Sequence, residues 1–419
     1  MTITQSNQWV GTENIVLPDD QVVHQWYRFV LAFPPHLVRQ YLDHFGLGSG
    51  ATVCDPFCGT GTTLVEAKMA GINGVGIEAA PLAHFASSVK TDWNVDPVEL
   101  LAHAEKIAAA ARVKKVPSRL RQLAPDAEAL LIGGSISPLP LHRTLVLLEQ
   151  ITEHYSDSYN KYELLAVAKM LPTEIGNLRF GPEIGVTRAK KADAPVVDIW
   201  LAAVEQTCRD LQSVVDSSAS SQALLGDARK ALAFLAPHSV DAVITSPPYP
   251  NEKDYTRTTR LESVLLGFMS SADDLRALKK TLVRSNTRTV YTTDDDDKWV
   301  SDHPEIQRLA VEIERRRVEM GKTSGFERIY HRVTKLYFGG MARHLEQMKG
   351  ILRPGARLAY VVGDQASYLR VLIRTGTILA DLAQRQGYEL ERIDLFRTRP
   401  ATVTKDQLRE EVVVLRWPG

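Results

Sequence analysis

The chain has 419 residues, 44% of them hydrophobic and 24% charged, which suits one enlarged domain or roughly two to three ordinary ones. Its 50 basic residues (Lys and Arg) balance 50 acidic ones, which excludes a protein that coats nucleic acid through bulk positive charge but leaves a local basic patch open. Three cysteines and no Cys/His cluster exclude a disulfide scaffold and a zinc module, so we expect no metal. The first residues lack a signal sequence, and no apolar run approaches the roughly 20 residues of a membrane span. We therefore expect a soluble, cytoplasmic protein without membrane contact.

The N-terminal part begins with a helix and a strand–loop–helix–strand series. Residues 30–47 carry apolar side chains at helical spacing around a Pro-Pro pair, which predicts a helix with proline in its first turn. Strand-like runs at 51–57 and 74–80 flank a glycine turn and a helical pattern at 64–70. A strand–helix–strand unit of this kind predicts a parallel sheet.

The central part alternates insertions with strands. Residues 96–220 are rich in Ala, Leu, Lys and Arg at helical spacing, which predicts a largely helical insertion. Strand patterns return at 222–228 and 240–249. A second, irregular insertion follows at about 265–325, and we interpret its acidic run, Asp294–Asp297, as a solvated loop.

The C-terminal part is regular and completes an α/β fold. Helical patterns near 328–350 and 368–386 surround a strand at 356–363. Two further strands, at 389–396 and 410–417, suit an antiparallel edge on a parallel sheet. The fold class is therefore α/β, with a doubly wound, mostly parallel sheet, an antiparallel C-terminal strand and largely helical insertions.

A glycine loop lies between the first strand and its helix. Gly59 and Gly61 would let the backbone approach a ligand at a helix N-terminus, where free N–H groups point outward. The loop lacks the lysine of a phosphate loop and the third glycine of a dinucleotide fingerprint. Asp55, at the end of the strand, would repel a pyrophosphate but suit a cationic, amine-bearing ligand.

The tetrapeptide Ser246-Pro-Pro-Tyr249 closes the strand at 240–249. Its two prolines remove two N–H donors and leave carbonyl oxygens as acceptors, and Tyr249 offers a flat face. These groups would cradle a planar amine. Taken alone, the tetrapeptide also fits a proline-rich turn.

These two motifs carry a resemblance to a known family. DPFCGTGTT at 55–63 resembles motif I of S-adenosylmethionine-dependent methyltransferases, especially amino-methyltransferases that act on nucleic-acid bases. SPPY resembles motif IV of DNA amino-methyltransferases, and its serine form is similar to the N4-cytosine enzymes. Phe33-Pro34 with the following helix resembles motif X. The resemblance covers about 20–95, 220–265 and 335–419.

The resemblance implies a Rossmann-like class I methyltransferase fold, S-adenosylmethionine as cofactor, S-adenosylhomocysteine as product and no metal. Glu78 would bind the ribose hydroxyls and Asp227 the adenine amino group, although the residues alone also fit a surface carboxylate and a helix N-cap. The implied cofactor-binding residues are Phe33, Pro34, Asp55, Phe57, Gly59, Thr60, Gly61, Thr62, Glu78 and Asp227. The implied catalytic residues are Ser246, Pro247, Pro248 and Tyr249.

The implied function is site-specific methylation of the cytosine N4 amine in double-stranded DNA, with base flipping and direct in-line transfer. The expected setting is a bacterial or archaeal cytoplasm, in association with the nucleoid. A cognate restriction endonuclease acting separately is a candidate partner. Three alternatives stay open: an N6-adenine DNA methyltransferase, an RNA or tRNA amino-methyltransferase, and a non-catalytic DNA-binding protein with a relic cofactor fold.

The resemblance also divides the chain into five segments. Residues 1–95 carry motifs X, I and II, residues 221–265 carry motifs III and IV, and residues 328–419 complete the catalytic domain. The insertion at 96–220 is a candidate for target recognition, and the insertion at 266–327 for DNA contact.

Three basic clusters lie in the insertions, at 112–121, 187–191 and 279–288. Each fits contact with a DNA backbone as well as a solvated helix face. Because the net charge is zero, DNA binding requires the positive charge to gather on one face, with the acidic run directed away from the duplex. His24, Trp26 and Tyr27 we interpret as packing residues.

Overall fold

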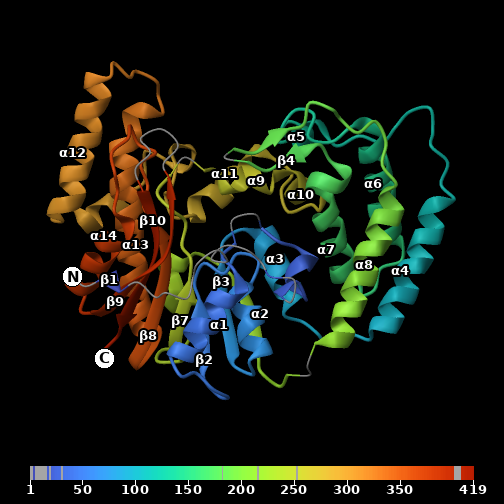
Figure 1. Cartoon of the computed structure of the whole chain (residues 1–419). Helices are drawn as coiled ribbons and strands as arrows, with labels where there is room; N and C mark the ends of the chain where they lie inside the picture. Colours follow the sequence, from blue (N-terminus) through green and yellow to red (C-terminus); the bar gives the residue numbers. More distant parts are fainter. Residues whose placement is uncertain are drawn as a thin grey trace.

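An eight-stranded sheet forms the centre of the protein in a computed structural model that describes residues 3–4, 17, 20–29, 32–181, 183–214, 217–251, 253–400 and 407–419 (Figure 1). The strand order is β1-β9-β10-β8-β7-β2-β3-β6. The strands are β1 (Ile3–Thr4), β2 (Thr52–Asp55), β3 (Asn73–Glu78), β6 (Ser221–Leu225), β7 (Val240–Thr245), β8 (Leu352–Gly363), β9 (Glu389–Pro400) and β10 (Gln407–Arg416).

The strand order defines a doubly wound sheet. From β2 the chain winds outward through β3 to β6, then returns to β7 on the other side of β2 and continues to β8, with parallel pairing throughout. Strand β10 pairs antiparallel with both β8 and β9. The prediction of a Rossmann-like class I methyltransferase fold with an antiparallel C-terminal strand is therefore confirmed. In such sheets ligands bind where the winding direction changes, which here is the junction of β2 and β7.

Both faces of the sheet are covered, because successive side chains of its central strands alternate between two cores. Val53 and Ile244 pack on the side of α1 (Pro35–His44). Their neighbours Cys54 and Val243 pack on the opposite side with α13 (Tyr330–Ile351). Helix α14 (Thr375–Arg385) contributes to the same core as α13. Strands buried on both faces read as continuous apolar runs, which is why VCD and AVIT in the sequence show no polar alternation.

A group of helices from the insertion at 96–220 lies to one side of the sheet (Figure 1). Its buried side chains form one core with those of α3 (Pro81–Lys90), the helix that follows β3. The insertion therefore packs directly on the sheet-bearing part of the chain. Its elements are α4 (Pro97–Arg112), α5 (Pro125–Glu128), α6 (Pro138–Glu153), α7 (Asn160–Met170), the π-helical turn η3 (Leu171–Ile175), β4 (Leu178–Arg179), β5 (Gly185–Val186) and α8 (Val196–Ser213).

The segment 20–29 joins the insertion to the sheet. The Trp26 Nε1–H donates to the Asp210 carboxylate of α8 at 2.8 Å. His24 Nε2 lies 2.7 Å from the Glu66 carboxylate of α2 (Thr62–Met69). Both His24 and Trp26 are buried, as a packing role requires.

The second insertion is more regular than the sequence analysis predicts. It contains α11 (Ala272–Thr281) and α12 (Pro304–Glu319), where the sequence suggests an irregular stretch at 265–325. Helix α12 carries mainly Glu and Arg on its exposed side, in pairs spaced three residues apart such as Arg315 with Glu312. Its buried residues Ile306, Leu309, Ala310 and Ile313 recur at helical spacing, and this is the signal by which the sequence could have shown the helix. No helix in the described part of the chain is long and apolar enough to cross a membrane.

The prediction of a solvated loop at Asp294–Asp297 is wrong for two of its members. Asp294 pairs with the buried Arg284 at 2.8 Å, and Asp296 is only 4% exposed. Asp296 begins the 3-10 helix η6 (Asp296–Val300). Part of the acidic run is therefore a component of the interior.

The helix predicted at 368–386 begins later, at Thr375. Leu369 and Arg370 have φ angles of +55° and +63°, in the left-handed region that a helix cannot include. Gln365 and Ile373 form an antiparallel bridge that closes this turn. The apolar spacing of 368–374 therefore reflects burial of a turn.

Candidate active site

Four neighbouring strands end at one edge of the sheet, and each is followed by a residue that the sequence analysis singles out. Asp227 follows β6, Glu78 ends β3, Asp55 ends β2 and Ser246 follows β7. Because the four strands are parallel neighbours, their carboxyl ends meet at the same edge. The structure therefore brings the predicted cofactor acids and the tetrapeptide together at the switch point of the sheet.

The Asp55 carboxylate fastens β2 to β7. It is fully buried and accepts hydrogen bonds from Thr245 Oγ1 (2.6 Å), Thr63 Oγ1 (2.8 Å) and the Phe57 N–H (3.1 Å). Burial raises the pKa of Asp55 to about 6, against the opposing effect of these hydrogen bonds. All three donors are groups of the protein itself. The buried Asp55 carboxylate therefore fixes the conformation of the glycine loop through hydrogen bonds within the fold.

The glycine loop leaves open space beside a hydroxyl group. Gly59 has φ +52°, and a Cβ atom there would meet nothing within 4 Å. Gly61 has φ +84°, and a Cβ there would lie 2.9 Å from the Cβ of Ser87, so only glycine fits. Thr60 Oγ1 is buried and has no hydrogen-bond partner among the described residues. Thr62 begins α2 directly behind the loop.

Glu78 and Asp227 already accept hydrogen bonds from their own surroundings. Glu78 accepts from the N–H groups of Gly59 and Ala80, each at 2.8 Å. Burial raises the pKa of Glu78 to about 7, although these two N–H groups oppose the shift. Asp227 accepts from the Arg229 N–H at 2.9 Å and caps the 3-10 helix η4 (Ala228–Ala233). The capping role that the sequence left open for Asp227 is therefore present. The Arg229 guanidinium donates two further N–H groups to this carboxylate, through Nε and Nη2. One of its four lone-pair positions is left for a further donor.

The remaining predicted cofactor residues pack on the two cores. The Phe57 ring meets the His344 ring edge-on at 4.9 Å, on the α13 side of the sheet. Phe33 packs against the core on the α1 side, and Pro34 is the extended residue that precedes α1. They frame the edge of the sheet from its two faces.

The tetrapeptide Ser246–Tyr249 leaves β7 beside the end of β8. Ser246 Oγ donates to the Val361 carbonyl of β8 at 3.2 Å, and the Ser246 side chain also interacts with that of Tyr249. The Tyr249 ring fills the space that Gly363 leaves, since a Cβ on Gly363 would lie 2.9 Å from Tyr249 Cε2. Burial, and then the Glu410 carboxylate, raise the pKa of Tyr249 above its usual range. The tyrosine ring is therefore neutral and fixed in place.

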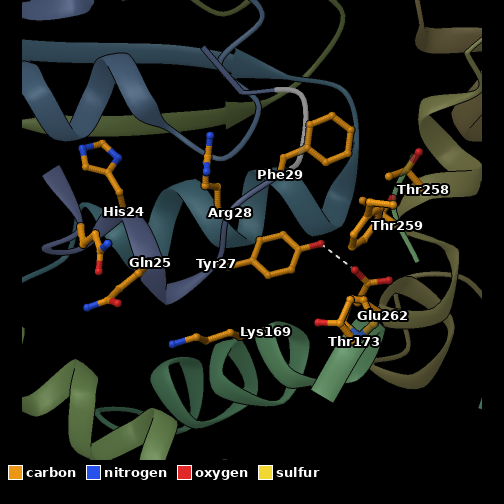
Figure 2. Close-up of a pocket in the computed structure, with 13 residues that line it drawn as sticks. His24, Gln25, Tyr27, Arg28, Phe29, Lys169, Thr173, Thr258, Thr259 and Glu262 are labelled. Atoms are coloured by element: carbon orange, nitrogen blue, oxygen red, sulfur yellow. Dashed lines mark hydrogen bonds between the residues drawn. The ribbon is translucent and has the colours of Figure 1, made fainter. Parts of the chain in front are cut away.

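A pocket of about 330 Å³ opens between the segment 20–29, η3 and the short helices α9 (Tyr255–Thr258) and α10 (Arg260–Leu265) (Figure 2). Tyr27 and Glu262 point toward each other in its wall, and the Tyr27 hydroxyl donates to Glu262 Oε1 at 3.0 Å. Glu262 Oε2 is buried without a hydrogen-bond partner in the described part of the chain. None of the predicted site residues lines this pocket.

A buried lysine connects the pocket wall to the glycine loop. Lys90 Nζ donates to the Thr60 carbonyl at 2.8 Å and lies 3.5 Å from the Tyr27 carbonyl. Burial lowers the pKa of Lys90 to about 7. Sequence analysis missed Lys90 and Glu262, because one charged residue in a helical pattern gives no sign that it points inward.

The residues at this edge fit an adenosyl ligand with an amino-acid tail. The open space at Gly59 and the orphaned hydroxyl of Thr60 admit a ligand at the helix N-terminus. The carboxylates of Glu78 and Asp227 offer acceptors for hydroxyl and amino groups. Among the described residues, no group of three or more His, Cys, Asp or Glu side chains could hold a metal ion.

The fold and this edge define a Rossmann-like methyltransferase. A family model described as DNA methylase (N6_N4_Mtase) matches residues 13–84. The chain is 26% identical over 434 residues to the type II methyltransferase M.BsoBI of Geobacillus stearothermophilus, with 95% of this chain and 84% of the relative covered. It is 24% identical over 435 residues to the type II methyltransferase M.AvaI of Nostoc sp., with 94% and 86% covered. The predicted resemblance to the DNA amino-methyltransferases is therefore confirmed.

Among solved structures, TrmN from Thermus thermophilus overlaps with a TM-score of 0.32 at 12% sequence identity, over 95% of this chain and 52% of that chain. This overlap is low. The fold assignment rests on the strand order and the switch point described above.

Replacing Glu262 by Gln should stabilise the protein at high pH. Burial raises the pKa of Glu262 to about 7, so the folded state holds a proton that the unfolded state releases above its ordinary pKa, near 4.5. The free energy of unfolding of the natural protein therefore falls as pH rises from about 4.5 through 7. The E262Q protein avoids this loss, so its melting temperature should gain a few degrees on the natural protein between pH 5 and pH 8.

Melting curves by circular dichroism at pH 5 and pH 8 measure this gain. The exposed Glu174, in the neighbouring η3, gives the control E174Q, which should shift equally at both pH values. A pH-independent difference between E262Q and the natural protein would contradict the assignment.

Proposed function

We propose that this protein transfers a methyl group from S-adenosylmethionine to the exocyclic N4 amine of cytosine in double-stranded DNA. The observation that carries the proposal is the position of Ser246–Tyr249 at the switch point, beside the glycine loop and the two carboxylates that follow β3 and β6. The printed names of the relatives, DNA methylase and type II methyltransferase, support a DNA substrate.

Ser246 and Pro247 would hold the amine. The Ser246 hydroxyl donates its proton to Val361, so its oxygen can accept one amine N–H, and the Pro247 carbonyl can accept the other. Two acceptors draw the nitrogen out of conjugation with the ring and leave its lone pair free to attack. Pro248 keeps this backbone stiff. Such positioning supplies about 7–11 kcal/mol in favourable systems.

Tyr249 would stack on the target base. A base inside a duplex cannot reach the end of β7, so it must leave the stack at a cost of a few kcal/mol. The Tyr249 ring is held by Gly363 and offers a flat, neutral face to repay part of that cost.

The cofactor would lie along the same edge of the sheet. Bound S-adenosylmethionine supplies an electrophilic methyl group and leaves as S-adenosylhomocysteine. Glu78 would accept from the ribose hydroxyls, Asp227 from the adenine amino group and Thr60 Oγ1 from the amino-acid tail. Gly59 would admit the ligand to the loop backbone, and Gly61 would let the loop pass close to Ser87. Phe33, Pro34, Asp55, Phe57 and Thr62 would shape the walls from the two cores.

We propose the insertion at 96–220 as the target-recognition region. Three exposed cations of its first basic cluster, Lys114, Lys115 and Arg119, form no ion pair within the described residues. By contrast, Lys279 and Arg284 in the cluster at 279–288 pair with carboxylates inside the fold. Free cations are the ones that can neutralise phosphates. A cytoplasmic, nucleoid-associated enzyme with a separately acting endonuclease would fit this activity.

The variants Ser246→Ala and Tyr249→Ala should abolish transfer while keeping the cofactor. Each removes one group that holds the amine or the base, so the rate of transfer should fall at least about 100-fold, the scale of losing one preorganised partner. Incorporation of tritiated methyl groups into DNA measures the rate, and calorimetry measures S-adenosylhomocysteine binding. Near-normal methylation by both variants would sink the proposed roles.

Cofactor affinity should rise with pH through the ionisation of Glu78. Below its pKa of about 7 the acid is protonated and loses acceptor capacity toward a diol, so S-adenosylhomocysteine should bind up to about tenfold more weakly at pH 6 than at pH 8. The Glu78→Gln variant should bind weakly and without this pH dependence. Calorimetric titrations at pH 6, 7 and 8 measure how the affinity changes with pH in the natural protein and in E78Q. If E78Q keeps the pH dependence, a group other than Glu78 causes it.

The modified base decides the finer assignment. The protein is incubated with S-adenosylmethionine and either unmethylated duplex DNA or bulk tRNA, and the digested nucleosides are analysed by mass spectrometry. We expect N4-methylcytosine from DNA alone. N6-methyladenine from DNA would replace the base assignment, and methylation of tRNA alone would overturn the DNA proposal. Single-molecule sequencing of DNA from expressing cells then gives the sequence context.

A further inference from the structure

Arg229 connects the proposed adenine-binding carboxylate to the second insertion. Its side chain is 6% exposed, and the residue lies two positions after Asp227 in the chain. Arg229 Nε and Nη2 donate to the two oxygens of Asp227 at 3.0 and 2.8 Å. Its Nη1 donates in the opposite direction, to Asp296 Oδ2 at 2.5 Å. One buried cation thus bridges two carboxylates that are 69 positions apart in the sequence.

Asp296 is held by helix α13 on the side away from Arg229. Its second oxygen lies 3.3 Å from Arg343 Nη1 of α13. Its backbone sits on a helix surface without side chains, since a Cβ on Gly339 would lie 1.8 Å from the Asp296 carbonyl oxygen. A Cβ on Gly340 would lie 3.4 Å from Asp296 Oδ2. The first turn of η6 therefore packs directly against two consecutive glycines of α13, where any side chain would clash with it or crowd it.

The bridge fixes the direction of the Asp227 carboxylate. A guanidinium group is planar, and its donors have fixed directions. Once Asp296 fixes one edge of Arg229, the edge that faces Asp227 is fixed as well. Without Asp296, the buried Arg229 would lose a charged partner and would reorient to recover hydrogen bonds. Asp227 would then lose its alignment, because two of its hydrogen bonds come from the Arg229 guanidinium group.

From this geometry we infer that Asp296 is a positioning residue for the cofactor site, acting through Arg229 on the carboxylate of Asp227. The inference rests on the proposed role of Asp227 toward the adenine amino group. It assigns to the second insertion a function in cofactor discrimination. A ligand that lacks the amino group should be indifferent to Asp296.

Two ligands isolate this amino group. S-adenosylhomocysteine carries it, and S-inosylhomocysteine has a carbonyl oxygen in its place. We expect the natural protein to prefer the adenosyl compound by about tenfold, the scale of one hydrogen bond to a charged acceptor. The affinity ratio of the two compounds is the readout, because a general loss of stability would weaken both alike.

The variant Asp296→Asn tests the inference, and Asp295→Asn is its matched control. Asp295 is the exposed neighbour and pairs only with the exposed Lys298, at 3.2 Å, among the described residues. The variant Asp227→Asn, which removes the proposed acceptor itself, should bring the affinity ratio close to one. We expect D296N to do the same, while D295N keeps the natural ratio. Calorimetry gives the ratio, and melting curves show that each variant is folded.

Other outcomes separate the two proposals. If D227N lowers the ratio but D296N keeps it, the positioning role is overturned and the proposed cofactor site stands. If D227N keeps the natural ratio, the role of Asp227 fails, and the inference fails with it. Should D296N not fold, Arg343→Gln loosens Asp296 through a residue that is one-third exposed. An unchanged ratio in R343Q would then overturn the inference.

Discussion

The Asp55 carboxylate holds together the two strands between which the sheet changes direction. Strands β2 and β7 are parallel neighbours, and the chain continues from them into opposite halves of the sheet. Asp55, at the end of β2, accepts hydrogen bonds from Thr245, at the end of β7, and from Thr63 of α2. The glycine loop starts on one side of this carboxylate and the tetrapeptide on the other. A buried carboxylate with several short hydrogen bonds is costly to disturb, so the distance between the two loops is set by the fold. The proposed transfer chemistry depends on that distance.

The sequence predicts the central part of the sheet well, because local and global preferences agree there. Glycines, prolines and strand-end acids mark the turns at Gly59, Gly61 and Ser246, and the apolar runs between them are strands buried on both faces. The doubly wound order follows from strand–helix–strand connections, whose handedness is nearly invariant. The roles of the individual site residues remain proposals, since they depend on a bound ligand.

Other features depend on contacts between segments that are distant in sequence, and no local pattern reports them. Asp296 lies in a run of four aspartates that suggests a solvent-exposed loop. The glycines it packs against, Gly339 and Gly340, are in α13, and its cationic partner Arg229 follows β6. Lys90 and Glu262 are charged residues whose burial depends on residues 20–29. Leu369 and Arg370 look helical, but their left-handed φ angles are imposed by the bridge between Gln365 and Ile373.

The segment 20–29 also bears on how such enzymes diverge. Trp26 is bound to α8 of the large insertion, Tyr27 to α10 and His24 to α2. The large insertion is therefore not joined to the rest of the protein only at its two ends. A third segment, residues 20–29, also packs in the interface between the insertion and the sheet. A recombination that exchanged only residues 96–220 with a relative would leave Trp26 facing an unmatched surface. An exchange of the proposed target-recognition region would therefore have to move at least two separated segments of the chain together, residues 20–29 and residues 96–220.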